Sequence, residues 1–458
     1  MIPRIFSRPA HRLAHRLTLG LVTAVALALP ALATVPVQAV TSPHGIKAWL
    51  VENHDLPFTA LEIRFRGGSS LDAPGKRGAV NLMAGLLEEG AGDMNAQQFA
   101  AARDALAAHF RFNSSDDDVS ISARFLSENR AKAIALLKQA IVHPRFDPDA
   151  IDRVRGQVIS NIKSDAKDPN AIAGNTFYRL AFGSHPYGSS DQGTLESVKA
   201  LTRQDMVDAH AATMARDRVY VAAAGDITPE QLGKLVDTLL DGLPAKGAPM
   251  PGPAKDLLTG GTTVVPFDTP QSVILFGEEG LKRHDPDFFP AYVMNEILGG
   301  GRFSARLMTE VREKRGLTYG VYSYLAPMDH AQLIMGSLAS DNAKAGEAIK
   351  VIKQQWAKMA EDGVTKEELD AAKTYLTGSY PLRFDGNSRI ARILVGMQMD
   401  HLPIDYIATR NKRMEAVTVA DVNRVAKRLL KPENLRFVVV GKPVGVHSTD
   451  SDGAAASN

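Results

Sequence analysis

The sequence LTRQDM (residues 201–206) is followed by VYVAAAG (219–225), and the same design returns as VTVADV (417–422) followed by LRFVVVG (435–441). In both copies the Thr and the closing Gly are 23 residues apart, and the copies are offset by 216 residues. Each copy contains a Thr that can cap a helix, an Asp three residues later, an amphipathic stretch and an apolar strand that ends at Gly. The equal spacing predicts two tandem homologous domains.

Strands also open each half of the chain. GIKAWLVEN (45–53) and FTALEIRFRGG (58–68) begin the first half, and GTTVVPF (261–267) and QSVILFGEEG (271–280) begin the second. Helical patterns lie between these strands and the closing strand of each half. Strands that are grouped around helices, instead of alternating with them, favour antiparallel pairing. We therefore predict an α+β fold in which each domain packs helices on an antiparallel-rich sheet.

Prolines and glycines mark the boundary between the halves. They are dense in residues 246–260, which predicts a linker. The N-terminal domain is then expected at 41–245 and the C-terminal domain at 261–445. Residues 446–458 repeat Ser, Asp, Gly and Ala, a composition that predicts a disordered tail.

The first 39 residues have the features of an export signal. They contain four Arg and no acidic residue, and residues 17–32 form an apolar run of 16 residues. A membrane-spanning helix needs roughly 20 such residues, and small-x-small cleavage sites follow at 31–33 and 37–39. We expect residues 1–39 to be a signal peptide and the protein to be exported to the periplasm. An uncleaved signal that acts as an anchor is the alternative.

Composition excludes several classes of site. The 458 residues include no Cys, which excludes disulfides, thiolate metal sites and cysteine nucleophiles. Without the four Arg of the signal, 49 of the 53 basic residues remain against 51 acidic ones. This balance does not favour nucleic-acid binding.

Three stretches of sequence resemble one family. They are GGSSLDAPGKRGAVNLMAGLLEEGA (67–91), AFGSHPYGSSDQGTLESVKALTRQDM (181–206) and LGGGRFSARLMTEVREKRGLTYGVYSYL (298–325). All three are similar to insulinase/pitrilysin-type zinc metallopeptidases, in particular to the short-chain bacterial and mitochondrial-processing branch. The resemblance covers roughly residues 41–445. It implies that the two domains form a clam-shell and hold peptides between them.

The residues that bind zinc in that family are missing here. Active members carry H-x-x-E-H on the first long helix, where two His bind the metal and the Glu takes a proton from metal-bound water. The corresponding positions are Asn81, Ala84 and Gly85, and the distal Glu ligand corresponds to Asn161. The resemblance therefore implies a member that binds no zinc of its own.

The acidic and His residues that follow the motif are the alternative source of metal ligands. The candidates are Glu88, Glu89, Asp93 and His109. No zinc-like spacing connects them, so capping or solvating the helix end is the simpler interpretation.

The second half retains a different pair of family residues. Arg312 and Tyr319 fall where active relatives carry an Arg and a Tyr that contact the substrate and the oxyanion of the tetrahedral intermediate. Arg supplies a charged planar fork and Tyr a neutral donor, a combination suited to that role. The alternative is structural, because basic residues before a Gly are typical of a helix end and Tyr is common in strands.

A glycine run, a histidine and an acidic turn are weaker candidates for a functional role. The Gly299–Gly301 run lacks the Lys-Ser/Thr of a phosphate loop; the resemblance implies a turn near the substrate path, and a plain helix stop is the alternative. The resemblance makes His185 structural. The Asp116–Asp118 turn is interpreted as solvated, although in relatives the strand that follows, residues 119–126, is an edge that pairs with peptide.

A missing metal site beside retained substrate contacts indicates a division of labour. Heterodimeric members of the family place zinc in one subunit and the Arg/Tyr pair in the other. The leading hypothesis is therefore a non-catalytic subunit of an exported zinc endopeptidase, with a zinc-bearing paralogue and a polypeptide substrate as partners. The rivals are a catalytically inert scaffold or peptide-binding protein, and a rewired hydrolase that needs no metal.

Overall fold

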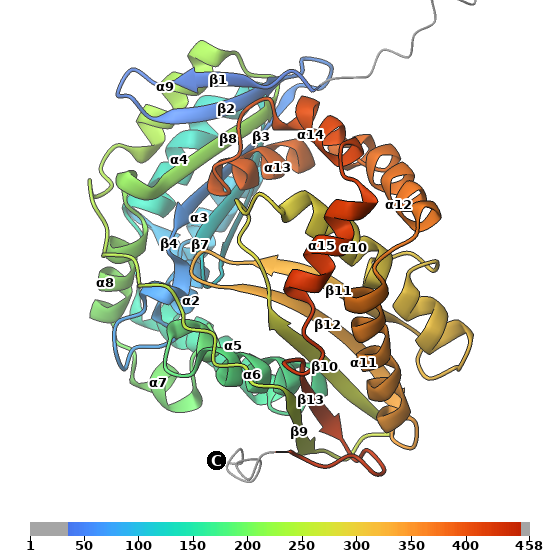
Figure 1. Cartoon of the computed structure of the whole chain (residues 1–458). Helices are drawn as coiled ribbons and strands as arrows, with labels where there is room; N and C mark the ends of the chain where they lie inside the picture. The colour runs from blue at the N-terminus through green and yellow to red at the C-terminus, as the bar shows by residue number, and fades with distance from the viewer. Residues whose placement is uncertain (1–34, 450–458) are drawn as a thin grey trace, which may run out of the picture. The chain divides into compact units, whose positions relative to one another are not determined.

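The computed structural model describes residues 35–449, of which residues 37–449 belong to one compact unit. Two separate sheets with packed helices confirm the α+β class (Figure 1). The first sheet has the order β1-β2-β8-β3-β7-β6 and the second the order β11-β12-β10-β13-β9. Their strands are β1 Gln38–Thr41, β2 Lys47–Glu52, β3 Phe58–Arg66, β6 His109–Ser114, β7 Asp118–Leu126, β8 Val219–Gly225, β9 Gly261–Pro266, β10 Gln271–Glu279, β11 Val321–Pro327, β12 Gln332–Asp341 and β13 Arg436–Gly441.

The helices follow the same division along the chain. Those of the first half are α2 Ala79–Leu86, α3 Ala96–Ala105, α4 Arg130–Val142, α5 Pro148–Asp165, α6 Pro169–Phe182, α7 Leu195–Ala200, α8 Arg203–Thr213 and α9 Pro229–Leu240. Those of the second half are α10 Phe288–Gly299, α11 Ala345–Asp362, α12 Lys366–Gly378, α13 Asn387–Met399, α14 Tyr406–Glu415 and α15 Val419–Leu429. A small hairpin, β4 Gly90–Ala91 with β5 Met94–Asn95, follows α2.

The repeated motif forms the same structure twice. Thr202 caps α8 and Thr418 caps α15, each in a capping box with the Asp three residues later. The strand that follows, β8 or β13, pairs in parallel with an early strand of its half, β2 or β9. Every other pair within the two large sheets is antiparallel. The internal repeat and the antiparallel-rich sheets therefore agree with the sequence prediction.

The two halves exchange one helix each. Helix α13 of the second half packs on β8 and β3 of the first sheet, and α6 of the first half packs on β13 and β10 of the second (Figure 1). The Gln398 side-chain amide donates to the Val221 carbonyl at 2.8 Å. A Cβ on Gly277 would lie 2.9 Å from the ring of Phe177, so α6 needs this glycine for its close approach. The exchange joins the halves into one body, which the sequence did not predict.

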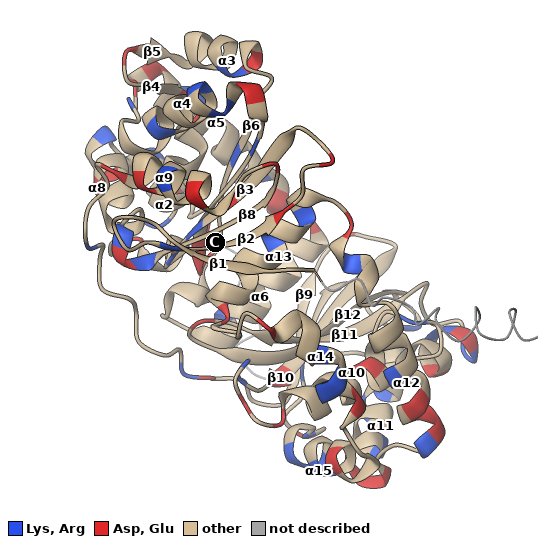
Figure 2. Cartoon of the chain, turned by 90° about the horizontal axis from the view of Figure 1, so that it is seen from above, with Lys and Arg blue, Asp and Glu red and all other residues tan. Residues whose placement is uncertain are grey.

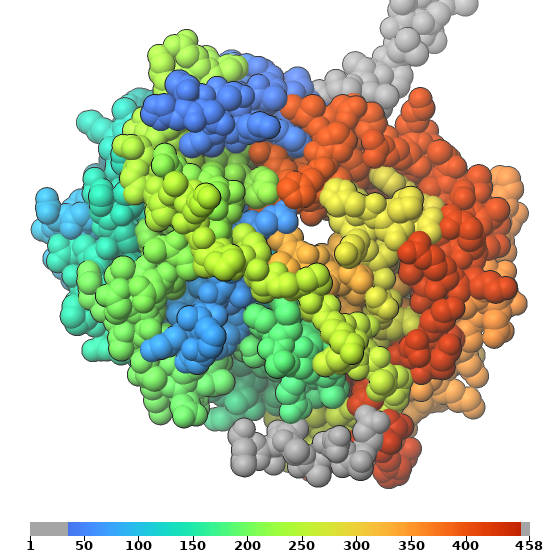
Figure 3. All heavy atoms as spheres, turned by 60° about the vertical axis from the view of Figure 1, so that its left-hand side comes forward, coloured from blue at the N-terminus to red at the C-terminus, as the bar shows by residue number. Residues whose placement is uncertain are grey.

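A second contact between the halves involves the acidic turn before β7. The Asp117 carboxylate accepts hydrogen bonds from the Tyr187 hydroxyl and, at 3.2 Å, from the Asp329 backbone N–H. The Arg66 guanidinium lies 3.2 Å from the Asp329 carboxylate. A cavity of about 410 Å³ adjoins this contact, and Figure 3 shows a hollow where segments of the two halves meet.

The solvated-turn interpretation of Asp116–Asp118 is therefore wrong. Asp116 binds Arg77, Asp117 makes the contact between the halves, and Asp118 lies 3.0 Å from Arg64. The strand that follows the turn, β7, is not an edge strand in this chain, because it lies between β3 and β6, and β6 is the edge.

The predicted ends of the chain fall mostly outside residues 35–449. Gln38 and Ala39 belong to β1 and pair with β2, so cleavage at 31–33 would leave this strand whole, whereas cleavage at 37–39 would not. The predicted tail begins at 446, yet Thr449 donates its backbone N–H to the Thr262 carbonyl at 2.9 Å. Residues 246–260 contain no helix or strand. No helix within the described part of the chain is both long and apolar enough to cross a bilayer.

Glu278 is buried beneath α11, and we expect it to make the free energy of unfolding depend on pH. Its carboxylate accepts the Trp356 indole N–H at 2.5 Å and the Lys431 backbone N–H at 3.1 Å, but burial raises its pKa to about 7. Since the folded pKa exceeds the unfolded value near 4.5, stability is complete below pH 4.5 and is lost as pH rises through 7. Glu278→Gln should remove this loss, which is on the order of 3 kcal/mol at pH 8.

Urea denaturation of both proteins at pH 5 and pH 8 measures this effect. The exposed Glu367→Gln variant is the control and should follow the wild-type pH dependence. A wild-type stability that is equal at both pH values would contradict the assignment to Glu278.

Candidate functional site

Helix α2 carries the positions where zinc ligands were sought, and it holds none. Asn81 donates from its side-chain amide to the Ser114 hydroxyl at 3.3 Å, and Ala84 is buried. Gly85 faces α5, where an added Cβ would lie 3.1 Å from Val154. The helix starts against Asp72, whose carboxylate accepts the backbone N–H groups of residues 78 and 80.

The fourth position lies on α5. Asn161 is exposed, and its side-chain oxygen accepts from the Gln157 amide at 2.9 Å, one turn earlier. An amide oxygen is a weak zinc ligand compared with imidazole or carboxylate, and residues 84 and 85 offer no ligand atom. The donor set at these four positions therefore does not fit zinc.

The acidic residues that follow α2 do not rebuild a site. Glu88 lies 3.2 Å from the Arg103 guanidinium, and Glu89 pairs with Arg153. Burial raises the pKa of Glu88, and nearby cationic groups oppose that rise. Within residues 35–449, no three His, Asp or Glu side chains are grouped so that they could hold a metal ion.

The donor set predicts that the purified chain, without an affinity tag, binds no zinc. After dialysis against zinc and then buffer, mass spectrometry should find well below one Zn per chain, and EDTA should leave the melting temperature unchanged. Stoichiometric zinc retained together with a chelator-sensitive melting temperature would contradict this prediction.

Arg312 and Tyr319 lie on the surface of the second half. Arg312 belongs to a π-helical segment, Met308–Glu313, and its guanidinium carbon is 4.6 Å from the ring centroid of Phe303. Tyr319 precedes the edge strand β11 and is 86% exposed. Neither side chain has a hydrogen bond or ion pair within the described residues, so both are available to a ligand.

Exposed aromatic residues flank this pair in the sequence, and one of them, Phe303, contacts Arg312. We define the aromatic face as Phe303, Tyr319, Tyr322 and Tyr324, all of which are exposed. Tyr322 and Tyr324 alternate with buried residues on β11, and their rings stack at 6.5 Å. Exposed aromatic side chains of this kind are typical of surfaces that bind another polypeptide.

The glycine run before the pair has a structural explanation. Gly299 ends α10 against β11, and a Cβ there would lie 2.8 Å from the Ser323 backbone nitrogen. Gly300 is buried beside Glu296, which pairs with Arg302 at 2.7 Å, whereas Gly301 is open. The close packing explains Gly299 and Gly300 without a substrate, so their substrate-binding role remains a prediction.

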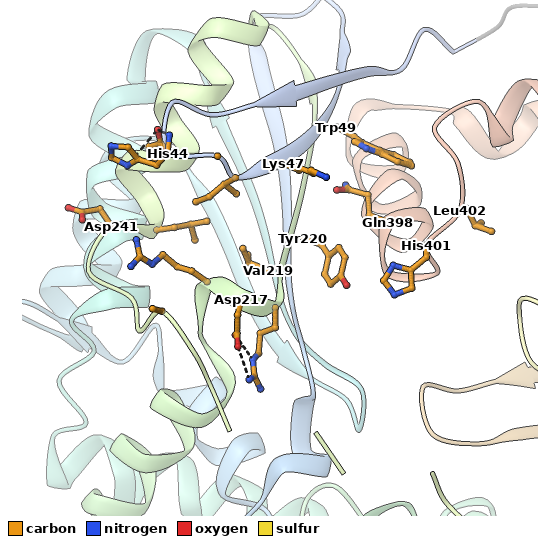
Figure 4. A pocket seen from close by; sticks show the side chains of 17 residues that line it. His44, Lys47, Trp49, Asp217, Val219, Tyr220, Asp241, Gln398, His401 and Leu402 are labelled. Atoms are coloured by element: carbon orange, nitrogen blue, oxygen red, sulfur yellow. Dashed lines mark hydrogen bonds and ion pairs between the residues drawn. The ribbon is translucent and has the colours of Figure 1, made fainter. Parts of the chain in front are cut away.

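A larger groove lies elsewhere, where α13 meets the first sheet. Its volume is about 800 Å³, and Lys47, Trp49, Tyr220 and His401 face it (Figure 4). None of the predicted site residues lines it. Its three carboxylates already have partners: Asp217 binds Arg218, Asp237 binds Ser42, and Asp241 binds Lys138. The groove therefore has no free carboxylate for acid–base chemistry.

The comparisons with known proteins agree with the fold. Residues 48–194, which include all four former zinc positions, match the description "Insulinase (Peptidase family M16)". Residues 200–376, which include Arg312 and Tyr319, match "Peptidase M16 inactive domain".

Relatives of known sequence or structure cover most of both chains. The non-peptidase homolog YmxG of Helicobacter pylori is 28% identical over 85% of this chain and 90% of its own length. An uncharacterized zinc protease of Mycobacterium leprae is 28% identical over 77% of this chain and 80% of its own length. The crystal structure of a peptidase M16 inactive domain from Pseudomonas fluorescens superposes with a TM-score of 0.84 and 28% sequence identity. The superposition covers 90% of this chain and 99% of that structure. The chain therefore belongs to the insulinase (M16) peptidase family, as a member whose zinc-ligand positions have lost their ligands.

Proposed function

We propose that this protein is the zinc-less subunit of an exported heterodimeric zinc endopeptidase. In this role it binds polypeptide substrate and presents Arg312 and Tyr319 to the active site of a zinc-bearing partner. The observation that carries the proposal is a contrast within one chain. The zinc positions have no suitable donors, whereas Arg312 and the 86%-exposed Tyr319 keep their donors free.

The chemistry expected of the pair needs no metal on this chain. A peptide carbonyl that is attacked in the partner's site develops negative charge on its oxygen. Arg312 can stabilise that charge with its guanidinium, and Tyr319 can donate a neutral hydrogen bond from its hydroxyl. The aromatic face offers apolar contact for the substrate side chains beside them.

Co-expression with a zinc-motif paralogue from the same genome tests the assembly. The pair should co-purify in equal amounts and cleave an unfolded polypeptide at least tenfold faster than the paralogue alone. The mature chain should be recovered from the periplasm with residues before 34 removed. A paralogue that is equally active alone would contradict the catalytic part of the proposal.

A second candidate is a catalytically inert scaffold or peptide-binding protein. The relative described as a non-peptidase homolog favours it. This candidate predicts that polypeptides bind, but that no assembly gains activity from this chain.

A further inference from the structure

The first sheet leaves part of one face open. Helix α13 covers β8 and β3, while β7 and the edge strand β6 lie beyond it. On β6, Arg111 is exposed between the buried Phe110 and Phe112. Arg124 on β7 is exposed on the same face of the sheet. It pairs with His109, which is two residues from Arg111 on β6, and residues two apart on a strand point to the same face.

Helix α13 adds two more arginines along this open face. Arg392 reaches toward β7, since its Nε is 3.9 Å from the Glu62 carboxylate, and Glu62 accepts a hydrogen bond from the Ser122 hydroxyl of β7 at 2.9 Å. Arg389 is exposed one turn earlier on the same side of the helix. We call Arg111, Arg124, Arg389 and Arg392 the basic face. Figure 2 shows the strands and α13 from above with Lys and Arg in blue.

The positive charge of the basic face is poorly compensated. Across residues 35–449, the guanidinium groups of Arg111, Arg124 and Arg389 have no hydrogen bond or ion pair. Glu62, which lies beneath Arg392, is buried, and burial raises its pKa. Glu88 is near Arg111 but already pairs with Arg103 at 3.2 Å. Three to four positive charges thus lie beside the outer edge of a sheet, although the chain as a whole is nearly neutral.

We propose that the basic face binds extended acidic segments of polypeptide. The inference rests on the proposed function in taking the occupant to be a polypeptide, and it names the class of substrate. An extended chain along β6 has a period of two residues, so alternate carboxylates would face Arg111 and Arg124 while the outward backbone groups of β6 are free to pair. Nucleic acid fits less well, because the exposed side chains of β6 and β7 include no Phe, Tyr or Trp ring for base stacking, and His109 is the one aromatic ring among them.

Peptide binding to the lone chain tests this inference. Two extended 12-residue peptides with a neutral dye should be compared by fluorescence anisotropy, identical except for Glu or Lys at alternate positions. The acidic peptide should bind at least tenfold more tightly than the basic one, and its affinity should fall as NaCl rises from 50 to 300 mM. Equal affinity of the two peptides, or no binding of either, would overturn the inference.

Charge-matched variants locate the site. Arg111→Glu with Arg124→Glu should weaken binding of the acidic peptide by about tenfold or more. Lys132→Glu with Lys350→Glu changes the net charge equally at exposed lysines on other elements and should change affinity by less than about twofold. The double variant Arg111→Gln with Arg124→Gln should also weaken binding of the acidic peptide. Its melting temperature should stay unchanged, which shows that the loss of binding is not a loss of folding. Equal losses in both Glu double variants would overturn the proposal.

Two further outcomes separate the hypotheses. Single-stranded DNA of 12 nucleotides that binds as tightly as the acidic peptide would assign the basic face to nucleic acid and overturn this inference. Acidic selectivity in a chain that adds no activity to a zinc-motif paralogue would overturn the proposed function and leave the inference standing.

Discussion

Arg312→Ala is expected to lower kcat/KM of the assembled pair by about 10²–10³, because one donor to a developing oxyanion contributes on that scale. Tyr319→Phe removes only a hydroxyl from an 86%-exposed ring and should cost a similar factor, mainly in kcat. Together the two substitutions should cost less than the product of the separate factors, since both act on one oxygen. Steady-state cleavage of a defined peptide by the purified pair measures all three values.

Matched variants distinguish this role from a structural one. Arg315→Ala is close in sequence but removes a group already bound to Glu310 at 2.7 Å, and Tyr375→Phe removes a hydroxyl from an exposed ring on α12, outside the aromatic face. Both should retain activity within about threefold. Unchanged kcat/KM in Arg312→Ala and Tyr319→Phe, with the pair still assembled, would favour the scaffold role.

The internal repeat could be predicted because its signals are local. A Thr cap with Asp at the third helical position forms a capping box whatever lies around it, and both boxes are present at Thr202 and Thr418. The apolar strand that follows must be buried, and every residue of β13 is. Local rules therefore sufficed for the element types and their order.

The exchange of α6 and α13 could not be predicted in this way. An amphipathic helix shows which face is buried, but not which sheet covers it. Phe177 on α6 packs against Gly277, 100 residues later, and Gln398 on α13 binds Val221, 177 residues earlier. The basic face could not be predicted for a related reason. The alternation of Arg111 and Arg124 with buried residues indicates that both are exposed on a strand, but only the packing of α13 on the first sheet brings Arg389 and Arg392 to the same face.

The acidic turn shows the limit of interpreting charge from composition. Three consecutive Asp residues are typical of a solvated loop, yet the partners of Asp116 and Asp117 are Arg77 and Tyr187, 39 and 70 residues away. Both partners lie in stretches that carry the family resemblance. The structure thus places these two residues of the resemblance in a network of hydrogen bonds that joins loops.

Arg77→Ala is expected to produce the largest loss of stability, about 3–5 kcal/mol, because it leaves buried acceptors and a carboxylate without their cation. The Arg77 side chain joins three loops that lead to α2, to β7 and to α7. Its acceptors are the Asp72 and Asp116 carboxylates and the carbonyls of Ser69, Pro186, Ser189 and Ser190. Burial already raises the pKa of Asp72 to about 6, and loss of the guanidinium would raise it further.

Urea denaturation with a surface control tests this expectation. Arg153→Ala removes an arginine that is 51% exposed and paired with Glu89, and should cost less than about 1 kcal/mol. Arg77→Lys keeps the charge but cannot form the fork of hydrogen bonds, so its stability should fall between those of the wild type and Arg77→Ala. If Arg77→Ala is too unstable to purify, the Lys variant still provides a measurable loss. If Arg77→Lys and Arg77→Ala are as stable as Arg153→Ala, the three loops hold together without the Arg77 side chain, and the expectation is wrong.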